Sequence, residues 1–407
     1  MTRLASSLSI HSPKKLIPHS PPSFASKLNV PKHRLRIANL PTPIQEIDVD
    51  SSNSNVFEIF KDLNVQFLMK RDDMSGGVEL GGNKIRKLEF LLADALEKGC
   101  DSVVTIGGEQ SNHCRATAAA CRMVNIEPHL ILRTRRANQV EKDKCEKNED
   151  SFGYVGNILF DRIVGANIHT CTPGEYGRFG SNELVDRVCK ELSAEDKKVY
   201  PIPVGGSNAL GTWGYIEAVG ELKSQLNGEK VDHVVFACGS GGTATGIAIG
   251  LALAFANDKE NLPQIHAIGV CDDPDYFYNE ISLIAKDMGF SVGDGSINDI
   301  KDFVENIVVV HQGKGKGYAA STQEELDFIL QFSIQTGIVL DPVYSGKALF
   351  RFMQEVKNNP NDYRDSRIMF WHTGGSLGAY EKIESMKQNM NISSPIKRMD
   401  VYGKGLE

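Results

Sequence analysis

Strand-like and helix-like segments alternate along most of this chain, and glycine-rich turns stand at several of the junctions between them. Three of these turns lie at 81–84, 107–108 and 239–243, and each is followed by a segment with helical periodicity. Strands that alternate with helices predict parallel sheets, because two parallel strands need a long crossover connection that is usually a helix. The pattern therefore predicts an α/β fold.

The predicted elements form two α/β runs. Strands are expected at 65–69, 102–106, 129–132, 167–169, 234–237, 265–270, 307–310 and 368–371, and helices at 84–96, 111–124, 157–164, 183–192, 244–255, 322–336 and 346–356. A chain of 407 residues exceeds a usual single domain. We therefore predict two doubly wound α/β domains, a large one from 40–97 and 204–407 and a small one from 98–203.

The first 45 residues differ in composition from the rest of the chain. They contain seven lysines and arginines and seven serines but no acidic residue, which is typical of an organellar transit peptide. We predict that residues 1–39 are a transit peptide and extension, removed in part, and that the protein is mitochondrial, with the plastid as the alternative. A basic arm that binds acidic surfaces is the weaker interpretation, because proline and serine rather than interleaved aromatic residues surround the charges.

Charge, cysteine usage and hydropathy exclude several classes of function. Without the seven basic residues of the leader the net charge of −7 becomes −14, and so acidic a body is a poor nucleic-acid binder. The eight cysteines form no C-x-x-C pair and no short Cys/His spacing, so neither a metal site nor a disulfide framework is expected. No run of about 18 apolar residues occurs, so no membrane span is expected.

A lysine, Lys84, stands between the turn Gly81-Gly82-Asn83 and a predicted helix. Leucines follow it at helical spacing, so the helix buries one face and Lys84 is held at the turn. A lysine fixed in this way can be desolvated and lose its proton near neutral pH, which suits a Schiff-base partner. The alternative is a basic residue at a solvated helix start.

The glycine loop at 239–243 lies between a strand and a helix, where backbone N–H groups and the positive helix end favour a phosphate. Taken alone, it fits a dinucleotide, a monophosphate cofactor or simple tight packing. A dinucleotide is disfavoured because the acidic residues Asp272 and Asp273 follow after about thirty residues rather than about twenty. A separate lysine turn and phosphate loop together indicate a pyridoxal phosphate enzyme, in which different segments hold the aldehyde and the phosphate.

A third polar turn follows the strand at 102–106 and contains Ser111, Asn112 and His113. Ser111 suits a helix cap, which is a purely structural role. With its two neighbours, the same turn offers donors for a substrate carboxylate and for a cofactor ring oxygen.

Four motifs in chain order resemble the aminocyclopropane-carboxylate deaminase and D-cysteine desulfhydrase family of fold-type II pyridoxal phosphate enzymes. They are GGNKIRKLEF at 81–90, GGEQSNH at 107–113, DPVYSGK at 341–347 and HTGG at 372–375. The resemblance runs from about residue 40 to about residue 380. It implies a fold like that of the tryptophan synthase β subunit with the cofactor in the cleft, and a small amino acid as the substrate. We also expect a homodimer.

The resemblance implies a role for each matching residue. Lys84 would form the Schiff base with the cofactor, and Asn112 would meet the ring oxygen. Lys84, Ser111, Tyr318 and Tyr344 would be the catalytic residues, the last three facing the substrate. The phosphate would be held by the glycine loop, that is by Gly239, Ser240, Gly241, Gly242 and Thr243.

Two positions separate the reactions within this family. In the cyclopropane-opening deaminases a glutamate follows the tyrosine of DPVY and a leucine follows the histidine of HxGG, whereas this chain has Ser345 and Thr373. A carboxylate beside the pyridine nitrogen keeps that nitrogen protonated and makes the ring a strong electron sink, while a hydroxyl leaves it neutral. The weaker sink suffices for β-elimination, because thiolate is a good leaving group. Ser345 and Thr373 therefore favour the desulfhydrase reaction.

The sequence thus predicts a lyase that converts D-cysteine and water to pyruvate, hydrogen sulfide and ammonia. Lys84 is the expected base for the Cα proton, and Tyr318 or Tyr344 is the expected acid for the sulfur. The alternatives are a 1-aminocyclopropane-1-carboxylate deaminase, an L-cysteine desulfhydrase, and a cofactor-binding protein without catalysis. L-Cysteine remains an alternative substrate, because a sequence does not show which face of the substrate Cα meets Lys84.

Overall fold

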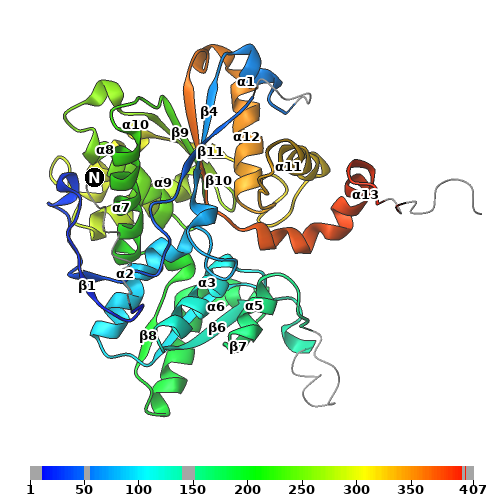
Figure 1. The fold of residues 1–407 in the computed structure, drawn as a ribbon. Coiled ribbons are helices and arrows are strands. Elements are labelled where there is room, and N and C mark those ends of the chain that lie inside the picture. The colour runs from blue at the N-terminus through cyan, green and yellow to red at the C-terminus, as the bar shows by residue number, and fades with distance from the viewer. Residues whose placement is uncertain (1–11, 50–55, 140–151, 397–398, 400–407) are drawn as a thin grey trace, which may run out of the picture.

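The computed structural model describes residues 12–49, 56–139, 152–396 and 399, which form two lobes with a mainly parallel sheet in each (Figure 1). The sheet of the larger lobe has the strand order β11-β10-β9-β12-β4-β3, in which β3 runs antiparallel to β4. Its strands are β3 (Ile44–Ile47), β4 (Gln66–Arg71), β9 (His233–Cys238), β10 (Gln264–Gly269), β11 (Val308–Gln312) and β12 (Arg367–His372). The parallel sheet of the smaller lobe has the order β7-β6-β5-β8 and consists of β5 (Ser102–Gly108), β6 (Glu127–Arg133), β7 (Asn167–Cys171) and β8 (Val199–Pro201).

The parallel strands of the large sheet end at one common edge. Arg71 of β4 pairs with His372 of β12, and Cys238 of β9 pairs with Gly269 of β10. The turns that follow β4, β9 and β12 therefore leave the sheet side by side. In open α/β sheets the carboxyl ends of the strands are where ligands bind.

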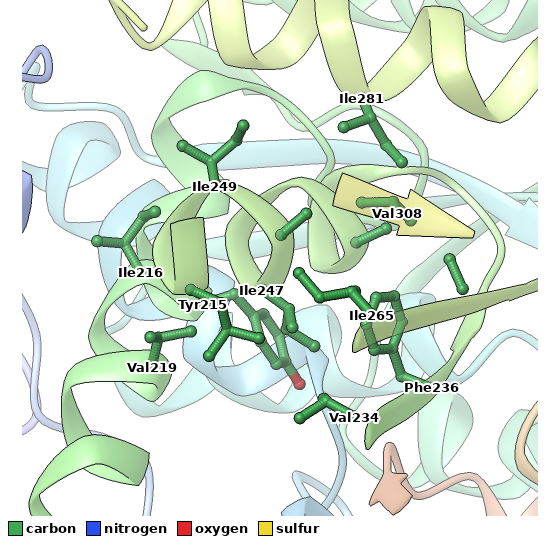
Figure 2. Close-up of a cluster of buried hydrophobic side chains, with 14 of the residues drawn as sticks. Tyr215, Ile216, Val219, Val234, Phe236, Ile247, Ile249, Ile265, Ile281 and Val308 are labelled. Carbon is green, nitrogen blue, oxygen red and sulfur yellow. The ribbon is translucent and has the colours of Figure 1, made fainter. Parts of the chain in front are cut away.

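Helices cover both faces of the large sheet, which the nearly continuous burial of its strands requires. On one face, Val234 and Phe236 of β9 belong to an apolar cluster (Figure 2) that is covered by α7 (Ala209–Leu226), α8 (Gly242–Ala254), α9 (Pro274–Asp287) and α10 (Ile297–Ile307). On the other face, Val235 and Ala237 belong to a cluster covered by α1 (Glu58–Asp62), α11 (Gln323–Thr336), α12 (Ser345–Asn358) and α13 (Ile383–Ser393). Successive strand residues point to opposite faces, so β9 contributes to both cores.

The helix α2 (Lys84–Glu97) joins the two lobes (Figure 1). Leu88 and Leu91 of α2 share an apolar cluster with Ala116 and Ala120 of the small lobe, and the same helix contacts α7 of the large lobe. The small lobe is otherwise built around its sheet by α3 (Asn112–Met123), α5 (Asn157–Ile163) and α6 (Pro173–Ala194). The residue that begins α2, Lys84, is thereby fixed relative to both lobes.

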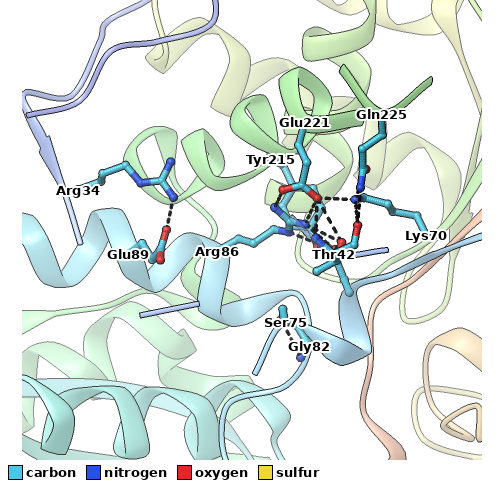
Figure 3. Close-up of polar contacts among 11 residues, drawn as sticks. Arg34, Thr42, Lys70, Ser75, Gly82, Arg86, Glu89, Tyr215, Glu221 and Gln225 are labelled. Carbon is cyan, nitrogen blue, oxygen red and sulfur yellow. Dashed lines mark hydrogen bonds and ion pairs between the residues drawn. The ribbon is translucent and has the colours of Figure 1, made fainter. Parts of the chain in front are cut away.

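A buried polar network anchors the start of α2 to the large lobe (Figure 3). Arg86 donates to Asp72 at 2.8 Å and to Glu221 at 3.0 Å, and Lys70 donates to Glu221 and, at 2.6 Å, to the Thr42 carbonyl. Burial is the strongest single influence and opposes ionisation of Asp72, but the charges of Arg86 and Lys70 and the hydrogen bonds from Arg86 and Tyr215 together outweigh it and lower the pKa of that carboxyl. A buried charge left without its partner costs several kcal/mol, on the order of 3–5. The network therefore makes the first turn of α2 costly to displace.

The predicted α/β architecture is confirmed, while the bounds of the two domains stay a prediction. The predicted strands of both sheets are formed, and most predicted helices begin and end within a few residues of their expected bounds. α6 begins well before residue 183, and the sequence pattern does not reveal α7, α9 and α10. None of the helices in the described part of the chain has the length and apolar character that a membrane crossing needs.

The packed chain begins earlier than the sequence pattern predicts. Residues 12–39, expected to belong to a transit peptide and extension, run along α2 and α8 and include a short antiparallel pair, β1 (Ile17–Pro18) and β2 (His33–Arg34). Leu35 is fully buried, and the His19 ring lies edge-on to Phe90 and Trp213 at centroid distances of 5.0 and 5.2 Å. Residues 1–11 of the predicted leader lie outside the described residues.

Candidate active site

Lys84 lies at the carboxyl edge of the large sheet, where it begins α2. The turn before it packs on the turn that follows β12, because the Asn83 N–H donates to the Thr373 carbonyl at 3.0 Å. Gly82 has a φ of +123°, and a Cβ there would lie 3.0 Å from the same carbonyl. This close approach requires glycine, and it fixes where the Lys84 side chain starts.

The Lys84 side chain is partly buried, and burial lowers the pKa of its amine to about 8. In the part of the chain that the structure describes, no protein group forms a hydrogen bond with this amine. An amine with this pKa is in part unprotonated near neutral pH and can then act as a nucleophile or a base. The sequence leads us to expect such a desolvated lysine, because Lys84 follows a glycine turn and begins a helix.

A second buried lysine faces the glycine loop after β9. Lys87 lies one helical turn after Lys84, and its amine donates to the Ser207 hydroxyl at 3.0 Å and to the Gly205 carbonyl at 3.2 Å. The Gly242 N–H donates to the same hydroxyl at 3.3 Å, and a Cβ on Gly242 would lie 3.0 Å from the Lys87 amine. Burial, and then the nearby Lys84 charge, lower the pKa of Lys87 well below its usual range. An ammonium group, the Gly242 N–H and the positive end of α8 suit a phosphate.

Other residues of the glycine loop tie it to the lysine turn. The Thr243 hydroxyl accepts from the Asn83 amide at 3.1 Å, and the Ser240 hydroxyl lies 2.8 Å from that of Ser207. Gly241, at the start of α8, has a φ of +81°, which favours glycine. The loop at 239–243 and the start of α2 therefore form one arrangement.

Two residues of the polar turn after β5 have structural partners. Ser111 caps α3, since its hydroxyl accepts from the Cys114 N–H at 3.2 Å. His113 turns into the small lobe, where its Nε2 lies 2.8 Å from the Thr105 hydroxyl. Burial, together with the charges of two lysines, lowers the pKa of His113 well below its usual range. His113 is therefore a neutral core residue, whereas Ser111 keeps a hydroxyl proton that it can donate.

Asn112 reaches from the small lobe to the turn after β12. Its Oδ1 accepts from Asn157 at 3.1 Å, and its Nδ2 lies 2.8 Å from where a Cβ on Gly375 would stand. A Cβ on Gly375 would also lie 3.1 Å from the Asp341 side chain. Asn112, Asp341 and the HTGG turn therefore meet across the two lobes.

Tyr318 and Tyr344 form a pair whose hydroxyl oxygens lie 2.6 Å apart. A Cβ on Gly239 would lie 2.9 Å from the Tyr344 ring, so the pair borders the glycine loop. The Arg133 guanidinium, at the end of β6, lies 5.8 Å from the centroid of the Tyr318 ring. Burial raises the pKa of both phenols. Both are protonated at neutral pH and can serve as proton donors.

Ser345 and Thr373 are both buried at this edge, and Ser345 is bound to a carboxyl group. Ser345 is fully buried at the start of α12, and its hydroxyl donates to Asp341 at 2.6 Å. The Asp341 carboxylate also accepts three backbone N–H groups, at distances of 2.7 to 3.0 Å. Burial raises the pKa of Asp341, although these hydrogen bonds oppose the shift. The hydroxyl proton of Ser345 is thus committed to a buried carboxyl group.

Lys87, Ser207 and Asp341 belong to this arrangement although the sequence did not lead us to expect them there. Lys87 carried a signal, because it lies three residues after Lys84 on a predicted helix and so on the same face. Asp341 opens the DPVY motif, where its position suits a turn. Ser207 carried no signal, since its neighbours in space are distant in sequence. No group of three or more possible metal ligands is found among the described residues.

Comparisons with known proteins identify the family of this chain. A family model described as pyridoxal-phosphate dependent enzyme matches residues 37–374. A relative from Arabidopsis thaliana, named bifunctional D-cysteine desulfhydrase/1-aminocyclopropane-1-carboxylate deaminase, mitochondrial, is 44% identical over 95% of this chain and 91% of its own. A relative from Thermotoga maritima, named putative 1-aminocyclopropane-1-carboxylate deaminase, is 36% identical over 85% of this chain and 97% of its own.

Solved structures share the fold. The crystal structure of an ACC deaminase homologue is 29% identical, with a TM-score of 0.68 over 87% of this chain and 95% of that one. A hydrogen sulfide-producing enzyme from Fusobacterium nucleatum is 15% identical, with a TM-score of 0.52 over 82% of this chain and 95% of that one.

Proposed function

The chain belongs to the pyridoxal-phosphate dependent enzymes, and from that membership we propose that it converts D-cysteine and water to pyruvate, hydrogen sulfide and ammonia. The observation that carries the choice of reaction is the pair of hydroxyl residues, Ser345 and Thr373, at the positions where cyclopropane-opening deaminases have glutamate and leucine. The 44% identical relative, whose name includes D-cysteine desulfhydrase, supports the same choice.

The residues at the sheet edge fit pyridoxal phosphate. Lys84 would bind its aldehyde carbon, and Asn112 would donate to its ring oxygen. Lys87 and the loop at 239–243 would hold its phosphate, because a buried amine and a backbone N–H already converge there on one hydroxyl at 3.0 and 3.3 Å. Ser345 and Thr373 would flank its ring nitrogen. When bound, the cofactor supplies a conjugated ring that accepts the electron pair left on Cα.

The chain's own residues would bind the substrate and move its protons. The Ser111 hydroxyl would donate to the substrate carboxylate. The Lys84 amine, with its pKa near 8, would take the Cα proton. Tyr318 or Tyr344 would give a proton to the sulfur that leaves Cβ. Because their oxygens lie 2.6 Å apart, the second phenol could then replace the proton of the first.

A second candidate is 1-aminocyclopropane-1-carboxylate deamination. One observation favours it, since the name of the Arabidopsis thaliana relative includes both activities. Ser345 and Thr373 disfavour it, because ring opening lacks the help of a thiolate leaving group. L-Cysteine is the remaining alternative substrate.

Turnover of three substrates separates these candidates. Purified enzyme with added pyridoxal phosphate should release sulfide and pyruvate from D-cysteine much faster than from L-cysteine, and little ammonia from the cyclopropane amino acid. The variant Lys84→Ala should fold yet lose turnover, because it removes both the covalent anchor and the base. Sulfide from L-cysteine alone, or ammonia from the cyclopropane substrate without sulfide from D-cysteine, would refute the proposal.

We further propose that the enzyme acts in the mitochondrion, with the plastid as the alternative. The acid-free leader supports an organelle, and the Arabidopsis thaliana relative carries the word mitochondrial in its name. A reporter fused to residues 1–45 should reach the organelle, and a reporter that stays in the cytosol would contradict this.

We also propose a homodimer. Exposed apolar side chains on the neighbouring helices α11 and α13 support it, since Ile334 is 53% and Ile392 74% exposed. Light scattering should give twice the mass of one chain, and the mass of a single chain at working concentration would contradict the proposal.

A further inference from the structure

Arg115, on the helix α3 of the small lobe, reaches into the loop that precedes Lys84. It is 3% exposed, and its guanidinium donates to the carbonyl of Val78 and, at 3.1 Å, to the carbonyl of Gly81. Gly81 stands three residues before Lys84 in the motif that positions it. A residue of one lobe therefore holds the backbone from which the lysine of the other lobe begins.

The same guanidinium also binds Asn157, the first residue of α5. Arg115 Nε donates to Asn157 Oδ1 at 2.8 Å. The Asn157 amide nitrogen then donates to the Gln110 carbonyl at 2.9 Å and to Asn112 Oδ1 at 3.1 Å. Arg115 is thus connected through one buried amide to the turn that carries Ser111 and Asn112.

This chain of hydrogen bonds fixes the orientation of two amides. A guanidinium can only donate, so the atom of Asn157 that faces Arg115 must be its oxygen. Its nitrogen must then face Asn112, and the atom of Asn112 that receives this bond must be the oxygen. The nitrogen of Asn112 is left to point the other way, toward the HTGG turn, where it lies 2.8 Å from the Cβ position of Gly375.

We propose that Arg115 is a positioning residue that holds the Lys84 turn and the Asn112 amide in register across the two lobes. The inference rests on the proposed function, in which Lys84 and Asn112 contact the same cofactor. Arg115 acts through the carbonyls of Val78 and Gly81 on one side and through Asn157 on the other.

The contacts of Arg115 require a guanidinium and not merely a positive charge. In the described part of the chain no carboxylate lies within ion-pair distance of Arg115, and the three oxygens to which it donates, those of Val78, Gly81 and Asn157, are all neutral. The nearby carboxyl group of Asp161, one turn after Asn157 on α5, is not an ion-pair partner of Arg115. It is fully buried, and burial raises its pKa to about 8. A lysine at position 115 would keep the charge but could not reach all three oxygens, because its donors radiate from one nitrogen atom.

Two variants and one control separate positioning from simple stabilisation. Arg115→Lys keeps the positive charge but removes the guanidinium group, whose donors are spread over three nitrogen atoms. Asn157→Asp keeps an acceptor for Arg115 but cannot donate to Gln110 or Asn112. The control is Arg122→Lys, because Arg122 lies on the same helix and also donates to backbone carbonyls, of Val164 at 2.9 Å and of Gly165, but at the surface. Each variant is compared in thermal unfolding without cofactor and in cofactor dissociation.

The spectrum of the bound cofactor is titrated with pH in each variant, and kcat and KM are measured. Arg115→Lys should release cofactor more readily and lower kcat by at least about tenfold, because small displacements of a reacting group cost large factors in rate. Asn157→Asp should shift the pH at which the visible absorption band of the bound cofactor titrates. Without the hydrogen bond from residue 157, the Asn112 amide is free to turn away from the cofactor ring oxygen. Arg122→Lys should match the unchanged enzyme in every measurement.

The proposal is overturned if both Arg115→Lys and Asn157→Asp keep the cofactor affinity, titration and kcat of the control. If Arg115→Lys does not fold, Asn157→Asp decides by the same titration. The cofactor measurements need no cysteine, so they remain informative if D-cysteine proves not to be the substrate.

Discussion

Two lysines of the helix α2 lie at the candidate site and have different surroundings. The Lys84 amine has no hydrogen-bonding partner in the described chain, whereas Lys87 donates to the Ser207 hydroxyl at 3.0 Å beside the glycine loop. The first is suited to covalent chemistry and the second to holding an anion. Burial lowers the pKa of both amines, that of Lys84 to about 8.

The lowered pKa of Lys84 predicts how cofactor loading depends on pH. Only the unprotonated amine attacks an aldehyde, so the rate at which apoenzyme captures pyridoxal phosphate should rise as the pH increases and level off above about 8. Stopped-flow absorbance measures this rate. The variant Lys98→Ala removes an exposed lysine that pairs with Asp94 and should leave the profile unchanged. A midpoint near the ordinary lysine value of 10.5 would contradict the desolvated environment.

The double variant Ser345→Glu, Thr373→Leu tests the choice of reaction. It should lower sulfide release from D-cysteine and allow some ammonia release from the cyclopropane amino acid, because a carboxylate would then face the ring nitrogen. The structure adds a constraint, since Ser345 lies 2.6 Å from the buried Asp341 carboxylate. A glutamate at position 345 would place a second carboxyl group beside that of Asp341, and two neighbouring carboxyl groups favour a shared proton.

Adding Asp341→Asn to this double variant should therefore increase its deaminase activity above that of the double variant alone. Cofactor content is measured in each preparation. Unchanged D-cysteine turnover with a full complement of cofactor would show that Ser345 and Thr373 do not select the reaction.

At the scale of elements, the N-terminal segment 12–39 is a structural part of the large lobe. Arg34 and the N–H groups of Ile37 and Ala38, the latter at 2.8 and 2.9 Å, bind the carboxylate of Glu89, which is 1% exposed on α2. Removing these partners leaves a buried charge uncompensated, which costs on the order of 3–5 kcal/mol.

A chain that begins at residue 40 should therefore unfold at a lower temperature and lose cofactor more readily than the full chain. A chain that begins at residue 12 is the matched control and should melt like the full chain. Differential scanning calorimetry measures both. Equal melting temperatures for the two truncated chains would show that the segment contributes nothing to the fold.

Three neighbouring strands of the large sheet carry a row of buried histidines. His233 Nδ1 lies 3.1 Å from His266 Nε2, and His266 Nδ1 lies 2.9 Å from His311 Nε2. Burial lowers the pKa of all three, that of His266 to about 2. Because these pKa values are lowered in the folded protein, the unfolded chain binds more protons than the folded one below a pH of about 6.5.

Stability should therefore be lost as the pH falls below about 6.5, by about 1.4 kcal/mol per pH unit for each histidine that stays neutral in the fold. Urea unfolding between pH 7 and pH 5 measures this slope. The variant His266→Leu should reduce the slope by about one proton, while the control His33→Gln, which alters a half-exposed histidine, should not. An unchanged slope in His266→Leu would contradict the account.

The site motifs could be predicted from the sequence because each is local. The lysine turn, the glycine loop and the SNH turn each lie within about ten consecutive residues, and strand and helix patterns surround them. The helix α7 was not predicted because its close contact with α2 requires glycine. A Cβ on Gly214 would lie 2.4 Å from the Arg86 carbonyl, and glycine weakens the helical pattern in the sequence. Ser207 was missed because its partner Lys87 is 120 residues away in the sequence. The packing of residues 12–39 was missed for the same reason.

At the scale of the whole molecule, the site lies where two lobes share one helix. The large lobe supplies Lys84, the glycine loop and the tyrosine pair, and the small lobe supplies Ser111 and Asn112. α2 contacts both lobes, and Arg115 of the small lobe donates to the Gly81 carbonyl of the large lobe. Neither lobe alone carries the full set of residues, so the proposed reaction depends on how the lobes are held together.

The most direct test of the central claim is to locate the covalent bond to the cofactor. Enzyme loaded with pyridoxal phosphate is reduced with borohydride, digested, and its peptides are sequenced by mass spectrometry. The account predicts a pyridoxyl group on Lys84 and on no other lysine, and in Lys84→Ala none at all, with Lys87 unmodified in both. A label on Lys87 or on a surface lysine, or stoichiometric binding without a label on Lys84, would contradict the assignment of this site.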